Sequence, residues 1–317
     1  MRSKINALLF SLKDESGVAK ILVALSIIVL LGFTALVIDV GAIYFEKSRL
    51  QKALDAAVLG GAHRLLVSEE EAKTTAISLA LKNGYDVVDD SKEMSTGNYF
   101  IEIEKKVNKE MTFARVLGVN STDINAVARA ELLYSALVQK GGIVPIGLED
   151  GKYDLSHGNE FALNLDNANK INGNHGFLSL DGRGEDSWED AVKYGSKSVF
   201  AIKDQIYPEP GNLGGNVYNA FNYRIKLDEN NPDKTYCNNF ETADNSCSRV
   251  VLVPIVSEFP NGRSDKVEIR HFAAFWLSGF EGKHNNIVKG VFMNYVTSGT
   301  FDDKGTKTNI YRVKLTK

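Results

Sequence analysis

The longest uninterrupted apolar stretch lies near the start of the chain. Eighteen consecutive residues, 21–38, contain no charge and no proline, and their only polar side chains are the hydroxyls of Ser26 and Thr34. As a helix rising about 1.5 Å per residue, this stretch is roughly 27 Å long, close to the hydrocarbon thickness of a bilayer. We therefore expect a transmembrane helix, because a helix satisfies its own backbone hydrogen bonds in lipid.

Two other interpretations of this stretch are weaker. A buried core helix is disfavoured, because the stretch has no polar face for solvent. A cleavable signal peptide could be cut after Ala42, but its apolar core is ordinarily shorter, and helical periodicity here continues through the cleavage site. The sequence leaves open whether the N-terminus is retained or cleaved, after Gly17 or after Ala42.

Helical spacing of apolar residues continues beyond the stretch, which predicts one helix from residue 17 to residue 66. Small residues recur along it at intervals of four, and such residues let backbones approach closely. We expect this stripe to pack on the protein's own domain; the alternative is a contact with a partner helix, including a second copy of the chain. The stripe consists of Ala53, Ala57 and Gly61.

A small α+β unit is predicted directly after the long helix. Ser68 and Glu71 form a capping-box pattern at the start of a second helix, and Gly84 is placed to end it. Residues 99–104 and 124–133 have the composition of strands, and a short helix is expected between them at residues 112–118. These elements predict a unit packed on the emerging helix.

The remainder of the chain is predicted to be mainly β. Residues 272–277 are apolar on both faces, which indicates a central strand, and helices are expected at 188–194 and 217–225. The architecture expected is a sandwich or a partly closed barrel, and the class of the whole chain is α+β. The β-like runs are 143–146, 161–165, 176–180, 199–202, 250–256, 267–276, 287–296 and 310–315.

The chain is thereby divided into four parts. They are a short cytoplasmic tail (1–20), a transmembrane helix (21–38), a membrane-proximal unit (39–139) and an extracytoplasmic mainly-β domain (140–317). Basic residues flank both ends of the span and barely discriminate its orientation. The N-terminus is placed inside because nearly all of the foldable chain follows the span.

Cys237 and Cys247 are the only cysteines, and they bracket nine residues of a polar loop. Two cysteines without a nearby histidine do not complete a tetrahedral zinc site. We expect a disulfide, which fits an extracytoplasmic location. The alternative is a pair of free thiols in a surface loop.

The rest of the sequence offers little catalytic chemistry. The net charge of −3 gives no support for nucleic-acid binding. The glycine-containing loop 208–216 precedes a helix and could hold an anion, but it lacks a phosphate-binding lysine motif, so a structural loop is preferred. The five histidines are scattered, and we assign no catalytic residue, cofactor or metal ligand. They are His63, His157, His175, His271 and His284.

A set of motifs in fixed order resembles a known family. The set is Glu15-x-Gly17, the apolar span, Ile38-Asp39-Val40-Gly41, Tyr44, Arg49-Leu50-Gln51-x-Ala53-x-Asp55-Ala56-Ala57 and Gly60-Gly61-Ala62. Residues 15–62 are similar in this respect to the N-terminal segment of TadE/TadG-like Flp pilus-assembly proteins. The resemblance implies a single-span membrane protein of a tight-adherence pilus or related apparatus, without enzymatic activity. Asp39 and Gly41 form its membrane-exit motif.

Two departures from related patterns restrict this resemblance. Pilin-type processing after Gly17 would need a glutamate five residues later, where this chain has Leu22, so we expect a fixed membrane component rather than a polymerising pilin. Some TadG-like proteins carry a von Willebrand factor A domain with an Asp-x-Ser-x-Ser metal motif. The similar run starting at Asp244 follows an asparagine-rich loop rather than an apolar strand, so no metal site is assigned to it.

Two functions follow from the sequence. The first is a structural or assembly component, whose partners are the lipid bilayer, other pilus or secretion proteins and a second copy of the chain. The second is a membrane-anchored binding module, in which the β domain binds a ligand, the cell wall or a partner protein. A tethered hydrolase would be a third, but no motif supports it. The ligand and the oligomeric state are not specified by the sequence.

Overall fold

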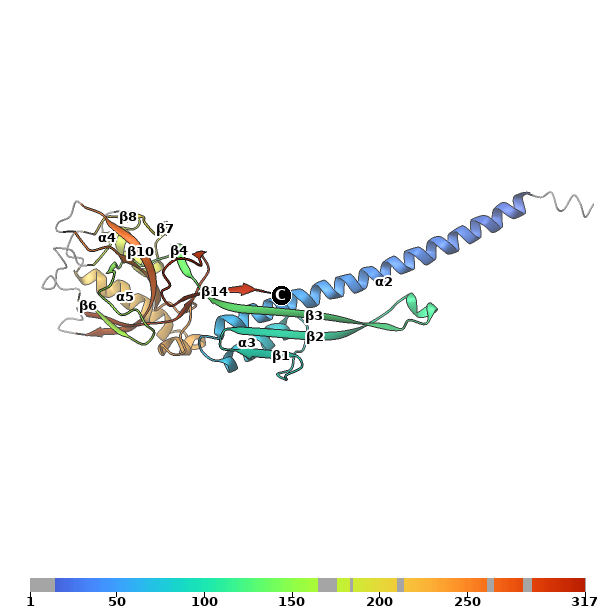
Figure 1. Ribbon diagram of the computed structural model, residues 1–317, viewed down its shortest axis with the longest axis horizontal. Helices are drawn as coiled ribbons and strands as arrows, with labels where there is room; N and C mark the ends of the chain where they lie inside the picture. Colours follow the sequence, from blue (N-terminus) through green and yellow to red (C-terminus); the bar gives the residue numbers. More distant parts are fainter. Residues whose placement is uncertain are drawn as a thin grey trace, which may run out of the picture.

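The computed structural model describes residues 15–164, 176–182, 185–209, 214–260, 265–281 and 287–316. Its most prominent element is the helix α2 (Glu15–Arg64), whose 50 residues form one continuous rod. At about 1.5 Å per residue the rod is roughly 75 Å long. Its N-terminal half projects away from the folded part of the molecule (Figure 1). The predicted continuous helix is confirmed.

The C-terminal half of α2 forms the core of a unit that we call the proximal unit. Leu50, Leu54 and Val58 are fully buried there, against the second helix and one face of a sheet. That second helix, α3 (Glu69–Lys82), begins where the capping box predicts, because the Ser68 hydroxyl accepts a hydrogen bond of 3.1 Å from the Glu71 N–H. It ends before Gly84, which adopts a positive φ of 91°.

The proximal sheet has the strand order β1-β2-β3-β14-β12. Its longest strands form a hairpin that pairs in continuous antiparallel register from Phe100↔Glu131 to Glu110↔Ser121. The last strand of the chain pairs with β3, so this sheet includes residues far beyond residue 139, where the sequence suggested a boundary. The strands are β1 (Met94–Gly97), β2 (Phe100–Glu110), β3 (Ser121–Tyr134), β12 (Tyr295–Val296) and β14 (Ile310–Leu315), and the short helix η1 (Ala114–Leu117) joins β2 to β3.

The rest of the chain forms a unit that we call the distal unit. Its main sheet has the order β5-β9-β10-β11-β6, with β8 paired to β10, and a smaller sheet has the order β13-β4-β7. The strands are β4 (Ala136–Gly141), β5 (Leu148–Glu149), β6 (Glu160–Asn164), β7 (Val199–Ala201), β8 (Gln205–Ile206), β9 (Val250–Val256), β10 (Val267–Glu281), β11 (Ile287–Phe292) and β13 (Thr300–Asp302). The helices are α4 (Glu185–Tyr194), α5 (Gly214–Glu229) and the 3-10 segment η3 (Pro232–Asn238).

The main distal sheet is covered on both faces. Along β9, Val251 and Val253 point to the side of α4 and α5, whereas Val250 and Leu252 point to the small sheet and the disulfide loop. This alternation is what a fully buried strand shows, since successive side chains point to opposite faces. The predicted central strand is confirmed, because β10 lies between β9 and β11. The α+β class is confirmed as well.

Two of the predicted β runs are not strands. Residues 143–146 and 176–180 form isolated bridges rather than a ladder: Ile146 pairs with Phe177, and Leu178 pairs with Pro208. Their apolar side chains are nevertheless buried. Burial alone produced the apolar pattern here, and Pro145, which has no N–H to donate, interrupts ladder pairing in the first run.

Candidate functional site

Asp39 lies where the exposed half of α2 gives way to the buried half. Its side chain is almost completely covered, with 3% of the residue surface exposed. One carboxylate oxygen accepts the backbone N–H of Thr112 at 2.9 Å, and the other accepts those of Phe113 and Ala114 at 2.9 and 2.6 Å. A single side chain of α2 thereby holds the turn of the β2–β3 hairpin.

The bound state of Asp39 is the ionised one. Burial raises the pKa of its carboxyl, but the three backbone donors, with Ala114 the strongest, outweigh that effect and bring the pKa below its ordinary value of 3.8. Hydrogen bonds to a carboxylate favour its charged form. The contact is therefore formed at neutral pH.

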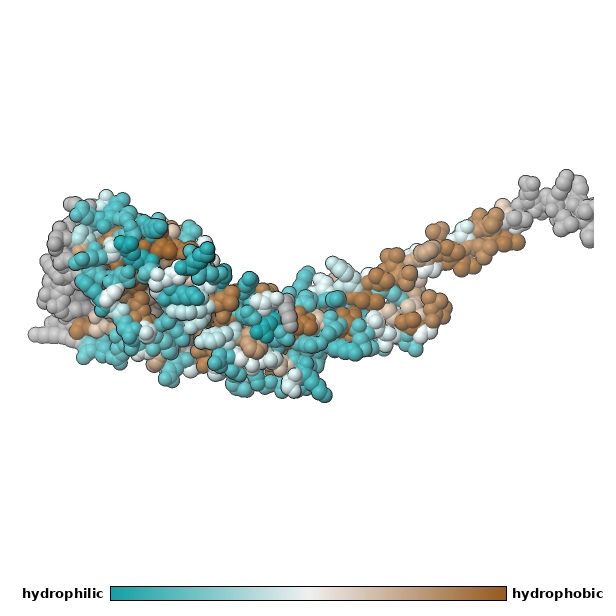
Figure 2. Space-filling view, in the orientation of Figure 1, coloured by the Kyte–Doolittle hydropathy of each residue, from teal (hydrophilic) through white to brown (hydrophobic). Residues whose placement is uncertain are grey.

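The hairpin turn held by Asp39 lies alongside the apolar part of α2. Together they line a groove of ≈ 300 Å³. Figure 2 shows apolar residues on both the projecting helix and the end of the hairpin beside it. The groove residues are Leu31, Gly32, Ala35 and Leu36 from α2, and Phe113, Ala114, Val116 and Leu117 from the hairpin.

The two residues of the membrane-exit motif have different surroundings. Asp39 is buried against the hairpin, whereas Gly41 is exposed, and a Cβ added to it would meet no atom within 4 Å. The structure thus gives Asp39 a contact across the fold and gives Gly41 none.

The small-residue stripe lies inside the proximal unit. Ala53 and Ala57 are buried in its core, and a Cβ on Gly61 would lie 2.8 Å from the backbone oxygen of Ala72 in α3. Gly61 thus lies close to α3, and Ala53 and Ala57 are buried in the protein's own proximal unit.

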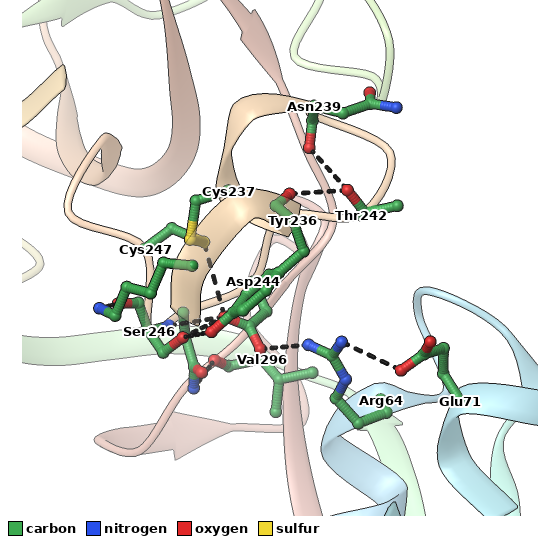
Figure 3. Close-up of polar contacts among 12 residues, drawn as sticks. Arg64, Glu71, Tyr236, Cys237, Asn239, Thr242, Asp244, Ser246, Cys247 and Val296 are labelled. Carbon is green, nitrogen blue, oxygen red and sulfur yellow. Dashed lines mark hydrogen bonds and ion pairs between the residues drawn. A yellow bond between two sulfur atoms is a disulfide. The ribbon is translucent and has the colours of Figure 1, made fainter. Parts of the chain in front are cut away.

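A second polar contact joins the end of α2 to the distal unit (Figure 3). The Arg64 guanidinium donates to Asp244 at 2.5 Å and to Glu71 at 3.2 Å. It also lies over the ring of Tyr236, 5.3 Å from the centroid. Arg64 therefore connects α2, α3 and the loop between the cysteines.

That loop is closed by Cys237 and Cys247, whose sulphur atoms lie 2.05 Å apart, at disulfide distance. The Cys237 carbonyl accepts the indole N–H of Trp276 on β10 at 2.9 Å. The loop thus rests on the main distal sheet on one side and meets Arg64 on the other. It is one of the parts of the distal unit that face the end of the long helix.

The same region contains the acidic residues that most resemble metal ligands. The carboxylate of Asp228 lies close to both cysteine sulphurs, but the sulphurs bond to each other, and its oxygens accept the N–H groups of Ser248 and Arg249 at 2.9 and 2.8 Å. Asp244 accepts the N–H of Ser246 at 2.9 Å in addition to its contact with Arg64. These carboxylates are engaged in structural hydrogen bonds.

The histidines in the described residues lie apart and make no catalytic cluster there. His63 lies near the unit junction, where burial lowers its pKa and the charge of Asp244 partly offsets the effect. The Nδ1 atom of His157 accepts the N–H of Asn294 at 3.1 Å, and His271 lies 3.8 Å from Asp150. His175, His284 and residues 210–213 of the glycine loop predicted at 208–216 lie outside the described residues.

Sequence reasoning missed the hairpin turn and Arg64 as contact residues. The turn carried a signal, because Phe113, Val116 and Leu117 occupy a connection between strands, where polar turn residues are the rule. No comparable sequence signal identified Arg64, because its partner Asp244 lies 180 residues away in the sequence.

Comparison with known proteins finds a family match for one segment of the chain. The family described as "Putative Flp pilus-assembly TadE/G-like" matches residues 17–64, which lie entirely within α2. The resemblance predicted from the motifs is thereby confirmed for this segment. No curated protein and no solved structure matches the chain.

Proposed function

We propose that the protein is a single-pass membrane component of a Tad-type pilus or secretion apparatus, with a structural or assembly role and no enzymatic activity. The similarity of residues 17–64 to the TadE/G-like family supports the apparatus. Among the described residues, α2 is the one helix long and apolar enough to cross a membrane.

The main support for the membrane anchor is that the N-terminal part of α2 is exposed and apolar, whereas its C-terminal part is packed in the proximal unit. The large apolar side chains between Ile21 and Ile38 are 48% to 69% exposed, which is costly in water and favourable in lipid. The hydroxyls of Ser26 and Thr34 donate to the carbonyls of Leu22 and Leu30, both at 2.8 Å. This segment therefore presents few unsatisfied polar groups to a bilayer.

The position of Asp39 supports retention of the anchor over cleavage after Ala42. Asp39 belongs to the folded proximal unit, because it accepts three hydrogen bonds from the hairpin. Cleavage after Ala42 would remove this residue and leave the three N–H groups without their acceptor. A signal peptide that is removed is not expected to supply hydrogen bonds to the folded protein.

We place the N-terminus in the cytoplasm and both folded units outside. The cysteine pair at disulfide distance fits an oxidising compartment. In this orientation the proximal unit lies at the membrane and the distal unit lies farther out along the same axis (Figure 1).

Reporter fusions test the orientation. A reporter active only outside the cytoplasm, fused after Lys317, is expected to be active, and the same reporter fused ahead of Met1 is expected to be inactive. The reverse pattern would place the folded units in the cytoplasm. A protein recovered in the soluble fraction with the new N-terminus at Ile43 would contradict the anchor.

Filament assembly tests the role. Removal of the protein from a bacterium that makes Tad-type pili is expected to abolish surface filaments, and the intact chain is expected to restore them. A matched chain in which residues 21–38 are replaced by a cleavable signal exports the same folded units without the anchor, and we expect it to fail. Unchanged filaments after removal would overturn the assembly role and favour the anchored binding module.

A further inference from the structure

The hairpin that Asp39 holds ends in an exposed cluster of large apolar side chains. We call Phe113, Val116, Leu117 and Val119 the apolar tip; their exposed fractions are 42%, 88%, 81% and 50%. A strand connection in water is ordinarily built from Gly, Pro, Asn, Asp and Ser. A contiguous exposed apolar patch marks a surface with a binding partner or a membrane.

The position of the apolar tip along α2 indicates that a membrane, rather than a binding partner, covers it. Phe113, Val116 and Leu117 share their groove with Leu31 and Leu36, which belong to the predicted span. Leu31 precedes Asp39 by eight residues, or about 12 Å of helix axis. Half of the hydrocarbon core is about 15 Å thick, so the tip lies at the depth of lipid acyl chains when α2 spans the bilayer.

The backbone of the turn is suited to that depth. Lipid offers no hydrogen-bond partners, so a non-helical segment must satisfy its polar groups within the protein. Asp39 accepts three of the N–H groups of the turn, and four others donate to carbonyls of the turn itself. These four are Met111 N–H to Asn120 O, Val116 N–H to Phe113 O, Gly118 N–H to Arg115 O and Val119 N–H to Ala114 O, at 2.9 to 3.1 Å.

The charge of the turn is paired with a residue at the end of β2. Arg115 is the one charged residue between Met111 and Val119, and its guanidinium pairs with Glu110 at 2.6 Å. A long arginine side chain can keep its charge near the headgroups while its stem lies against apolar surface. The tip therefore brings no unpaired charge into the acyl region.

We propose that the apolar tip inserts among the lipid acyl chains of the bilayer that α2 crosses, in the half nearer the folded units. This inference rests on the proposed membrane anchor. The protein then has two contacts with one membrane, a spanning helix and an inserted turn. A single helix allows the attached units to tilt relative to the bilayer, and the second contact opposes that tilting.

Tryptophan quenching by brominated phospholipid tests the insertion in the full-length protein reconstituted in phosphatidylcholine vesicles. Three variants place a tryptophan at exposed apolar sites: Leu117→Trp in the tip, Phe33→Trp in the span, and Tyr99→Trp in the proximal unit at the opposite end of β2. The native Trp188 and Trp276 are buried in the distal unit and supply a constant background.

We expect the Leu117→Trp emission to be quenched to an extent comparable with Phe33→Trp, and the Tyr99→Trp emission to be unchanged. Quenching of Phe33→Trp without quenching of Leu117→Trp overturns the insertion and leaves the anchor standing. Absence of quenching in Phe33→Trp overturns the anchor itself. Val116→Trp, at the most exposed tip position, repeats the measurement should Leu117→Trp fail to fold.

Discussion

The two halves of α2 differ in apolar content and have opposite surroundings. From Ile21 to Ile38 its large apolar side chains are exposed, whereas Leu50, Leu54 and Val58 are buried in the proximal unit. In the first half apolar residues surround the helix, and in the second they form one stripe with charged residues opposite. The halves therefore differ both in total hydrophobicity and in its angular distribution, and a core-packing helix of this kind needs only one apolar face.

The largest effect is expected when one leucine in each half is truncated, which tests whether the two halves differ in burial. Leu54→Ala removes a fully buried side chain and is expected to lower the free energy of unfolding by about 2–5 kcal/mol. Leu30→Ala removes a side chain that is 64% exposed and is expected to leave that free energy unchanged. Chemical denaturation of both variants in the same detergent measures the difference, and equal losses would refute the division of α2.

Two adjacent glycines, Gly60 and Gly61, test how closely the buried half of α2 packs against α3. The added Cβ of Gly61→Ala would lie 2.8 Å from the Ala72 backbone oxygen, which cannot move without displacing α3, so a loss of about 1–3 kcal/mol is expected. Gly60→Ala meets only the terminal methyl of Leu79 at close range. That methyl can rotate away, and the gain in helix propensity of about 1 kcal/mol offsets the strain.

Thermal unfolding of the two glycine variants gives the measurement. Gly32→Ala, in the exposed half, has no neighbour within 4 Å of its new methyl and serves as the control. A Gly61→Ala protein as stable as wild type would mean that α2 and α3 are not closely packed at this point.

The junction at the end of α2 is tested by a double-mutant cycle. Arg64 and Asp244 have side chains only 17% and 18% exposed, so their interaction is partly shielded from solvent. We expect Arg64→Ala and Asp244→Ala to be coupled by about 1 kcal/mol. Glu71, whose side chain is 52% exposed, provides the control pair, with a coupling below about 0.5 kcal/mol.

Replacement of Asp39 tests the border between the halves and has a local effect. Asp39→Ala leaves the backbone N–H groups of Thr112, Phe113 and Ala114 without their acceptor. We expect the turn to loosen and trypsin to cut faster after Arg115, with little change in global unfolding. Gly41→Ala, the other motif position, is the control and should cleave at the wild-type rate.

The same contact predicts a dependence on acid. The folded pKa of Asp39 is below its ordinary value of 3.8, so its stabilising effect is complete above that pH and is lost as the pH falls through the folded pKa. Pepsin cleavage near Phe113 and Leu117 in detergent should therefore increase below pH 3.8 in the wild type. Because pepsin activity itself varies with pH, the wild type is compared with Asp39→Ala at each pH: the difference between them should shrink below pH 3.8, and a difference that does not change with pH would contradict the role of Asp39.

Local elements were predicted well from the sequence. The runs 250–256 and 310–315 coincide with β9 and β14, and the Ser68 cap forms as expected. These features depend on residues close in the chain, through side-chain alternation or one hydrogen bond. Local patterns are therefore sufficient to place them.

Contacts between distant segments were not predictable in the same way. The pairing of β14 with β3 and the hydrogen bonds of Asp39 join residues more than 70 positions apart. Asp39 was singled out by its motif, but nothing in its neighbourhood identifies the hairpin as its partner. Residues 143–146 show the opposite error, since burial between other elements produced a strand-like pattern without a ladder.

The course of the chain between the two units has a mechanical consequence. The chain leaves the proximal sheet from β3 and returns to it at β12 and again at β14, and β3 and β14 meet the distal unit at the same end, where Tyr134 pairs with Tyr311. Tension on the distal unit directed away from α2 is therefore shared by several covalent segments that pull in the same direction. Such a load does not unzip β3 from β14; it passes as shear across the buried face of the sheet into the helix.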